Sequence, residues 1–168
     1  GYDEVSLTSL STTDHSCIRD VLGRLNRRLE DTGIRVSIPS QRLDSFGVDM
    51  AELVAGQKRG GLTFAPEAGT QRLRDVINKN LAEEDLMNAC KIAFSGGADS
   101  VKLYFMAGLP TETDEDLLGI PELARKVTWN WRQNSPNRAR GLKVSVSVAG
   151  FVPKAHTPFQ WAAQNRPE

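Results

Sequence analysis

Cysteine, long apolar runs and an excess of either charge are scarce or absent in this sequence. The 168 residues include two cysteines, Cys17 and Cys90, whose separation fits no metal-ligand spacing. Each is expected to be a small apolar residue on a helix face.

The 21 Lys and Arg residues balance 21 Asp and Glu residues, so no global field attracts nucleic acid or an anionic membrane. No run approaches the roughly 20 apolar residues of a membrane span, and the first residues do not resemble a secretory signal, so a cytoplasmic location is expected.

What the sequence does contain is a regular alternation of strand and helix patterns. It is 39% hydrophobic and 25% charged, which suits the core of one domain spanning residues 1–168. Strands are predicted at 3–11, 34–40, 61–70, from 101 onward, and 142–153. Helices are predicted at 14–31, 50–55, 71–78, from 83 to the Gly96-Gly97 pair, and 113–131. Five strands joined by helical crossovers predict an α/β fold with parallel strands, either an open doubly wound sheet or an incomplete barrel.

Both architectures place function at the carboxyl ends of the strands. Glycine, proline and small polar residues gather at these points, where they let backbone amides and carbonyls face a ligand. These strand ends are Ser9 and Ser11, Pro39 and Ser40, Pro66 to Gly69, Gly108 to Pro110, and Phe151 to Pro153. The sequence therefore predicts a ligand-binding rim.

Four stretches at this rim, in chain order, resemble successive strand ends of the radical S-adenosylmethionine (radical SAM) enzymes. They are "SLTSLS", "FAPEAGTQRLRDVINKNLAEEDL", "VKLYFMAGLPTETDEDL" and "GFVPKAHTPFQW". The resemblance is closest to a branch with methylthiotransferases, elongator-type catalytic subunits and cobalamin-binding radical SAM proteins. It implies a partial (βα) TIM-type barrel with helices on the outer face. In the family, a 4Fe-4S cluster cleaves S-adenosylmethionine reductively to a 5′-deoxyadenosyl radical.

The resemblance also implies which part of the barrel this chain supplies. The family's first unit carries cluster-binding cysteines spaced CxxxCxxC, and no such loop occurs here. The chain is therefore expected to be the C-terminal portion of the core barrel with the first βα unit missing. On this view the cluster ligands belong to the full-length enzyme, and the fragment alone is inactive.

Individual cofactor contacts follow from the same resemblance. Backbone at Ser9, Leu10 and Ser11 would meet the methionyl amino group, and Glu67 would face the ribose or the methionyl end. Lys79 would lie near the methionyl carboxylate. The remaining expected contacts, mainly to adenine, are Ser40, Gly108, Leu109, Pro110, Phe151 and Val152. The resemblance identifies neither the catalytic residues nor the substrate, for which tRNA and protein are candidates. No metal ligand is expected in this chain.

Two other functions are also compatible with the sequence. The chain could be a noncatalytic RNA- or protein-binding module that uses Arg72, Arg74, Lys79 and the loop 132–141 as a basic surface. It could also be a phosphate-binding barrel enzyme, although the glycine-rich "SGGADS" precedes a strand instead of following one.

Several residues with reactive or aromatic side chains are expected to be structural. His15 suits a helix start, Glu112 favours the positive end of the following helix, and His156 lies in a loop. The three tryptophans are expected to be packing residues and not base-stacking platforms. The first strand, lacking a neighbour on one side, is expected to promote self-association.

Overall fold

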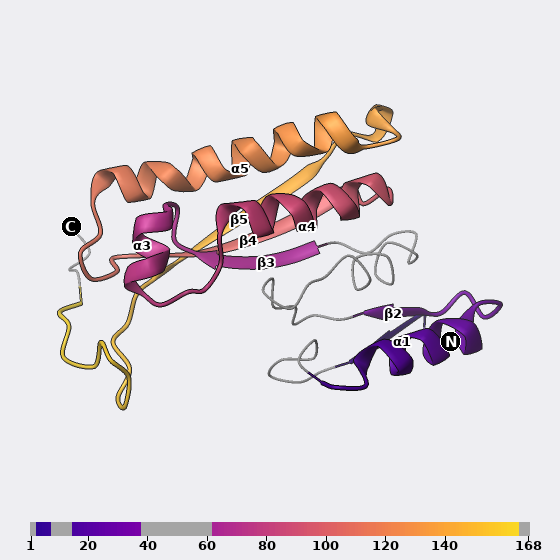
Figure 1. Ribbon diagram of the computed structural model, residues 1–168, viewed down its shortest axis with the longest axis horizontal. Helices are drawn as coiled ribbons and strands as arrows, with labels where there is room; N and C mark the ends of the chain where they lie inside the picture. The colour runs from indigo at the N-terminus through magenta and orange to yellow at the C-terminus, as the bar shows by residue number, and fades with distance from the viewer. Residues whose placement is uncertain (1–2, 8–14, 38–61, 165–168) are drawn as a thin grey trace.

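Strands and helices alternate along the chain in the computed structural model, which describes residues 3–7, 15–37 and 62–164 (Figure 1). The strands are β1 (Glu4–Ser6), β2 (Arg35–Ser37), β3 (Leu62–Glu67), β4 (Ser100–Ala107) and β5 (Lys143–Gly150). The helices are α1 (Ile18–Leu29), α3 (Gln71–Val76), α4 (Glu83–Ser95) and α5 (Asp114–Asn134), followed by the 3-10 turn η3 (Arg138–Arg140).

Every described strand pair is parallel, and the strands follow one another in sequence order. They form a two-stranded sheet, β1–β2, and a three-stranded sheet, β3–β4–β5. The predicted α/β class is confirmed, and the arrangement is compatible with a partial α/β barrel. Within the described ranges the strands pair as two sheets, and not as one continuous sheet of five. The segment 38–61 connects the two sheets and lies outside these ranges, as does the helix predicted at 50–55.

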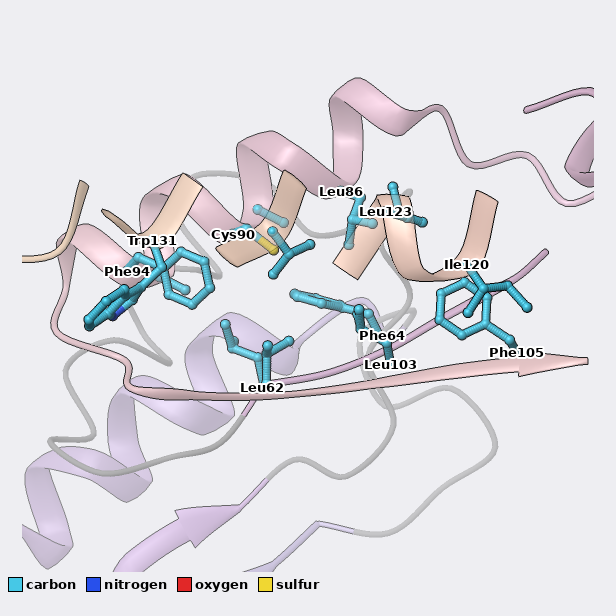
Figure 2. Packing of buried hydrophobic residues seen from close by; sticks show 14 of the residues in the cluster. Leu62, Phe64, Leu86, Cys90, Phe94, Leu103, Phe105, Ile120, Leu123 and Trp131 are labelled. Carbon is cyan, nitrogen blue, oxygen red and sulfur yellow. The ribbon is translucent and has the colours of Figure 1, made fainter. Parts of the chain in front are cut away.

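Helices α4 and α5 cover one face of the three-stranded sheet (Figure 1). Along β4, buried Val101, Leu103 and Phe105 alternate with residues that are exposed or partly exposed. Figure 2 shows the labelled side chains of β3 and β4 meeting those of α4 and α5 in the space between sheet and helices. Because side chains alternate across a strand, the opposite face of this sheet carries the remaining residues of each strand.

The ends of α4 follow the chemistry read from the sequence. Glu83, Glu84 and Asp85 occupy its first turn, where negative charge complements the helix dipole. The helix ends before Gly96, and Gly97 follows with a φ of 95°, a conformation that glycine adopts without a steric penalty. These signals fix the length of the helix that lies over the sheet.

Helical spacing predicts one apolar stripe on α1, and the structure only partly confirms it. The stripe comprises Ile18, Val21, Leu22, Leu25 and Leu29. Ile18 and Leu22 are buried, and Leu25 and Leu29 pack against the same core. Val21, expected on this stripe, is 37% exposed. It lies one position from Leu22 and therefore about 100° away around the helix, so both cannot face the core fully.

No helix in the described part of the chain is both long enough and apolar enough to cross a membrane.

Candidate functional site

Three strand ends meet at the carboxyl edge of the sheet β3–β4–β5. We call the residues there the strand-end rim: Glu67–Thr70, Gly108–Thr113 and Phe151–Val152. Parallel pairing along β4 brings the three ends to the same edge, and the Phe151 amide donates to the Ala107 carbonyl at 2.8 Å. The rim thus joins residues that are far apart in the sequence, including six of the expected cofactor contacts.

A small apolar cluster lies directly beneath the rim, separate from the main core. Its buried members are Ala68, Leu73 and Leu109, and Ile77, Met106 and Phe151 pack against them. Leu109 is 4% exposed, so its side chain packs beneath the loop, and its carbonyl accepts from the Glu112 amide at 3.1 Å. Val152, in contrast, is 46% exposed and offers an apolar surface to a ligand.

Glu67 and Lys79 form an ion pair at the end of β3. The Lys79 Nζ lies 3.4 Å from Glu67 Oε1, and both side chains are partly exposed. Glu67 follows a register shift in β3 and has a φ of 68°, which is uncommon for a residue with a side chain. The structure therefore brings together the two charged residues expected at the cofactor site.

The loop from β4 to α5 is held in a tight turn by its own side chains. Gly108 has a φ of 86°, and its amide donates to Glu112 Oε2 at 2.6 Å. Glu112, which the sequence predicts to complement the positive end of the following helix, thus also closes the loop that precedes α5. Thr111 has a φ of 66°, an unfavourable conformation for a β-branched residue, and its carbonyl accepts from the Arg72 guanidinium at 2.9 Å.

Asp116 connects the loops that follow β3 and β4. Its carboxylate accepts hydrogen bonds from the hydroxyls of Thr70 and Thr113, from the Thr113 amide at 2.8 Å and from the Arg72 guanidinium. The residue is only 2% exposed. Burial by itself raises the pKa of Asp116, but the hydrogen bonds outweigh burial and hold the pKa well below its ordinary value.

Two glycines allow these loops to approach each other closely. A Cβ on Gly69 would lie 2.5 Å from the Ile120 nitrogen, and a Cβ on Gly119 would lie 2.8 Å from the Gly69 carbonyl carbon. The backbone after β3 therefore packs directly on the first turns of α5. This contact fixes the two loops of the rim relative to each other.

Arg74 secures the same loop from below. It is 1% exposed, and its guanidinium donates to the Ala68 carbonyl at 3.0 Å, to the Gly69 carbonyl at 3.4 Å and to Gln71 Oε1 at 3.1 Å. Desolvation lowers the pKa of Arg74, and this effect is opposed by Glu83 and Asp75. An arginine this buried cannot belong to the basic surface that the RNA-binding interpretation required.

Sequence analysis did not predict that the rim loops are held together by Thr70, Arg72, Arg74 and Asp116. The pattern Thr113 to Asp116 has the spacing of a capping box, which could have signalled that Asp116 turns back toward the loop. No comparable signal marks Arg74, because its role depends on carbonyls that only the folded loop brings close.

Four expected cofactor contacts, Ser9, Leu10, Ser11 and Ser40, lie outside the described residues.

Of the residues expected to be structural, His15 does lie at a helix start, where its Nδ1 accepts from the Cys17 amide at 3.2 Å. His156 is exposed in the loop after β5. The prediction for the tryptophans is wrong in two cases: Trp131 is buried, but Trp129 and Trp161 are 58% and 90% exposed.

The two cysteines occupy different environments. Cys90 is fully buried in α4, as predicted, and burial raises the pKa of its thiol to about 12. Cys17 is exposed just before α1, so it is not a core residue. Among the described residues, no group of three His, Cys, Asp or Glu side chains could hold a metal ion.

Comparison with known proteins bears on the whole arrangement. The family model of the radical SAM superfamily matches residues 1–124. An uncharacterised protein of Methanocaldococcus jannaschii is 38% identical over 158 residues, which cover 94% of this chain. The same match covers 32% of that protein, so the chain spans about a third of its relative's length.

Proposed function

The chain belongs to the radical SAM superfamily, and we propose that its strand-end rim is the S-adenosylmethionine-binding part of a radical SAM catalytic core. The observation that carries the proposal is the convergence of Glu67, Gly108 and Val152 at one sheet edge. The first two lie inside the residues that match the family model, and Val152 follows the last strand.

The chemistry of the rim suits the parts of S-adenosylmethionine. Glu67 could accept from ribose hydroxyls or pair with the methionyl ammonium, and Lys79 could pair with the methionyl carboxylate. The two side chains already lie 3.4 Å apart, so a zwitterionic methionyl end could replace their mutual contact with one contact to each. Exposed Val152 and the backbone of Gly108 to Pro110 would pack against adenine.

Bound S-adenosylmethionine would supply a carbon-centred radical in the full enzyme. The role of this chain is to bind and orient that cofactor. The rim loops are held in position by Asp116, Arg72 and Arg74, so that the groups that would contact the cofactor are in place before it binds. Preformed contacts lower the entropy cost of binding.

The cysteines of this chain do not fit a 4Fe-4S cluster. Such clusters are held by cysteine thiolates, and Cys90 is a buried thiol whose pKa is raised to about 12. Cys17 is a single exposed thiol. We therefore propose no cluster-dependent step for the residues of this chain, and we assign cluster chemistry to the full enzyme.

The motif order favours the branch with methylthiotransferases, elongator-type subunits and cobalamin-binding proteins, acting in the cytoplasm on a substrate selected by other segments. A noncatalytic RNA-binding module is less well supported, because Arg74 is buried and Arg72 and Lys79 are paired with carboxylates.

Isothermal titration calorimetry with S-adenosylmethionine tests the proposal on the chain itself. Without metal coordination, we expect a weak affinity, with a Kd of roughly 1 mM or about −4 kcal/mol. Glu67→Ala should weaken binding by a further factor of about three to ten, since a hydrogen bond to a charged group is lost.

The matched control is Glu30→Ala, which removes an exposed carboxylate at the C-terminal end of α1, outside the sheet β3–β4–β5. It should bind like the unmodified chain. Equal weakening by both substitutions would mean that net charge, and not the rim, governs the affinity. Measurable binding that Glu67→Ala leaves unchanged would contradict cofactor binding at the rim.

A further inference from the structure

The face of the sheet opposite α4 and α5 carries a distinct set of side chains. Because residues in register on neighbouring strands share a face, Thr63, Lys102 and Ser145 form one row across β3, β4 and β5. Tyr104 and Ser147 form the next row toward the rim, and Met106 and Ala149 the one after it. We call these residues, with Ser100 and Lys143, the inner face.

Two lysines lie next to each other on this face. Lys143 is in register with Ser100, two residues before Lys102, so strand spacing and rise put the two lysine Cα atoms about 8 Å apart. Both lysines are exposed. Neither ammonium has an ion pair or hydrogen bond with another residue in the described ranges.

The inner face contains no carboxylate to balance this charge. Its side chains are ammonium, hydroxyl, phenol and small apolar groups, whereas Val101, Leu103 and Phe105 occupy the helix-covered face. The nearest acid along the chain, Asp99, precedes β4, and its backbone carbonyl accepts from the Lys143 amide.

Two like charges flanked by hydroxyls are complementary to an oxyanion. Each ammonium can donate to it, Thr63 and Ser145 add neutral donors beside Lys102, and binding relieves the repulsion between the lysines. Tyr104, 43% exposed in the adjoining row, provides an aromatic surface for the part of a ligand that leads toward the rim.

We propose that the inner face binds the carboxylate or phosphate of the substrate through Lys102 and Lys143, at the end of the sheet away from the cofactor. This inference rests on the proposed function of the rim. Lys102 lies five residues before Ala107 at the end of β4, a separation of roughly 17 Å. The substrate is therefore elongated, with an oxyanion at one end and its reacting atom at the other.

Amide chemical-shift mapping of the chain tests this site with inorganic phosphate and acetate as separate probes. The expected result is a saturable shift at Thr63, Lys102 and Ser145 with at least one probe, and the stronger probe identifies phosphate or carboxylate as the better ligand. Lys102→Met should weaken this binding about tenfold, and Lys102→Met with Lys143→Met should abolish it.

Lys91→Met is the matched control, because Lys91 is exposed on α4 and belongs to the other layer of the molecule. It should leave the shifts unchanged. Shifts that are not saturable with either probe, or that weaken equally in Lys91→Met, would overturn the inference. Circular dichroism of each variant excludes loss of folding as the cause.

A parallel titration with S-adenosylmethionine separates this inference from the proposed function. Cofactor binding at the rim without oxyanion binding at the inner face would overturn only the inference. Oxyanion binding without cofactor binding would support the anion site and count against the rim. Lys102→Met should leave cofactor affinity unaltered, because Lys102 lies far from the rim along β4.

Discussion

At the residue scale, Asp116 is the carboxylate on which the geometry of the rim depends. Its hydrogen bonds reach Thr70 and Arg72 on one side and Thr113 on the other, and it is almost inaccessible to solvent. A buried carboxylate with several donors is stable as an anion, and removing its charge leaves those donors unmatched.

Asp116→Asn should therefore lower the free energy of unfolding by about 2 kcal/mol at neutral pH, a moderate value because Arg72 is half-exposed. Chemical denaturation measures the change. Asp114→Asn, an exposed neighbour in the first turn of α5, is the control and should cost well under 1 kcal/mol.

The same carboxylate predicts a pH dependence. Its pKa is lower in the folded chain than the ordinary value of 3.8, so its stabilising contribution is present above that value. The contribution is lost progressively as the pH falls below about 4. Asp116→Asn should flatten the loss of stability in this acid range, and an unchanged acid profile would contradict the assignment.

At the element scale, the segment after β3 and helix α5 touch through Gly69 and Gly119. Gly69→Ala should force the two apart and lower the free energy of unfolding by about 2 kcal/mol, because its Cβ meets α5 backbone that cannot move independently. Thermal and chemical denaturation measure this. Gly23→Ala, in the open on α1, should instead stabilise by up to about 1 kcal/mol.

Combining Gly69→Ala with Gly119→Ala extends this test. Both substitutions act on one contact, so the double variant should lose less stability than the two single variants together. Full additivity would mean that the two glycines do not share a contact.

The sequence predicts elements better than it predicts the contacts between them. The strand β4 and the acidic start of α4 depend on local pattern, and both elements are found where expected. The division into two sheets, the burial of Arg74 and the pairing of Arg72 with Asp116 depend on tertiary neighbours. The pairing of Glu67 with Lys79 could be expected only because a family resemblance assigned both to one ligand.

At the scale of the whole molecule, β5 is an edge strand of the three-stranded sheet in the described ranges and carries exposed valines. Val146 and Val148 are 44% and 51% exposed, and β4 is the only strand in the described ranges that pairs with β5. At the other end of the strand order, β1 pairs with β2, and its Val5 is 40% exposed. Edges of this kind favour association with another chain.

We therefore expect concentration-dependent self-association of the chain in sedimentation velocity, reduced by Val148→Lys because a charge on an edge strand disfavours pairing. Val21→Lys, a similar change on the exposed side of α1, should have no effect. A strictly monomeric chain at high concentration, or equal effects of the two substitutions, would contradict an association through β5.

The proposed cofactor site of this radical SAM core is a single sheet edge, the strand-end rim. Amide chemical-shift mapping during titration with S-adenosylmethionine tests this site most directly, since the method detects millimolar binding and locates it. We expect saturable shifts concentrated at Glu67 to Thr70, Gly108 to Thr113, and Phe151 to Val152, and we expect Glu67→Ala to weaken the binding. Saturable shifts confined to the groove lined by Met87, Trp129 and Gln133 on the outer side of α4 and α5, or shifts that Glu67→Ala leaves unchanged, would contradict it.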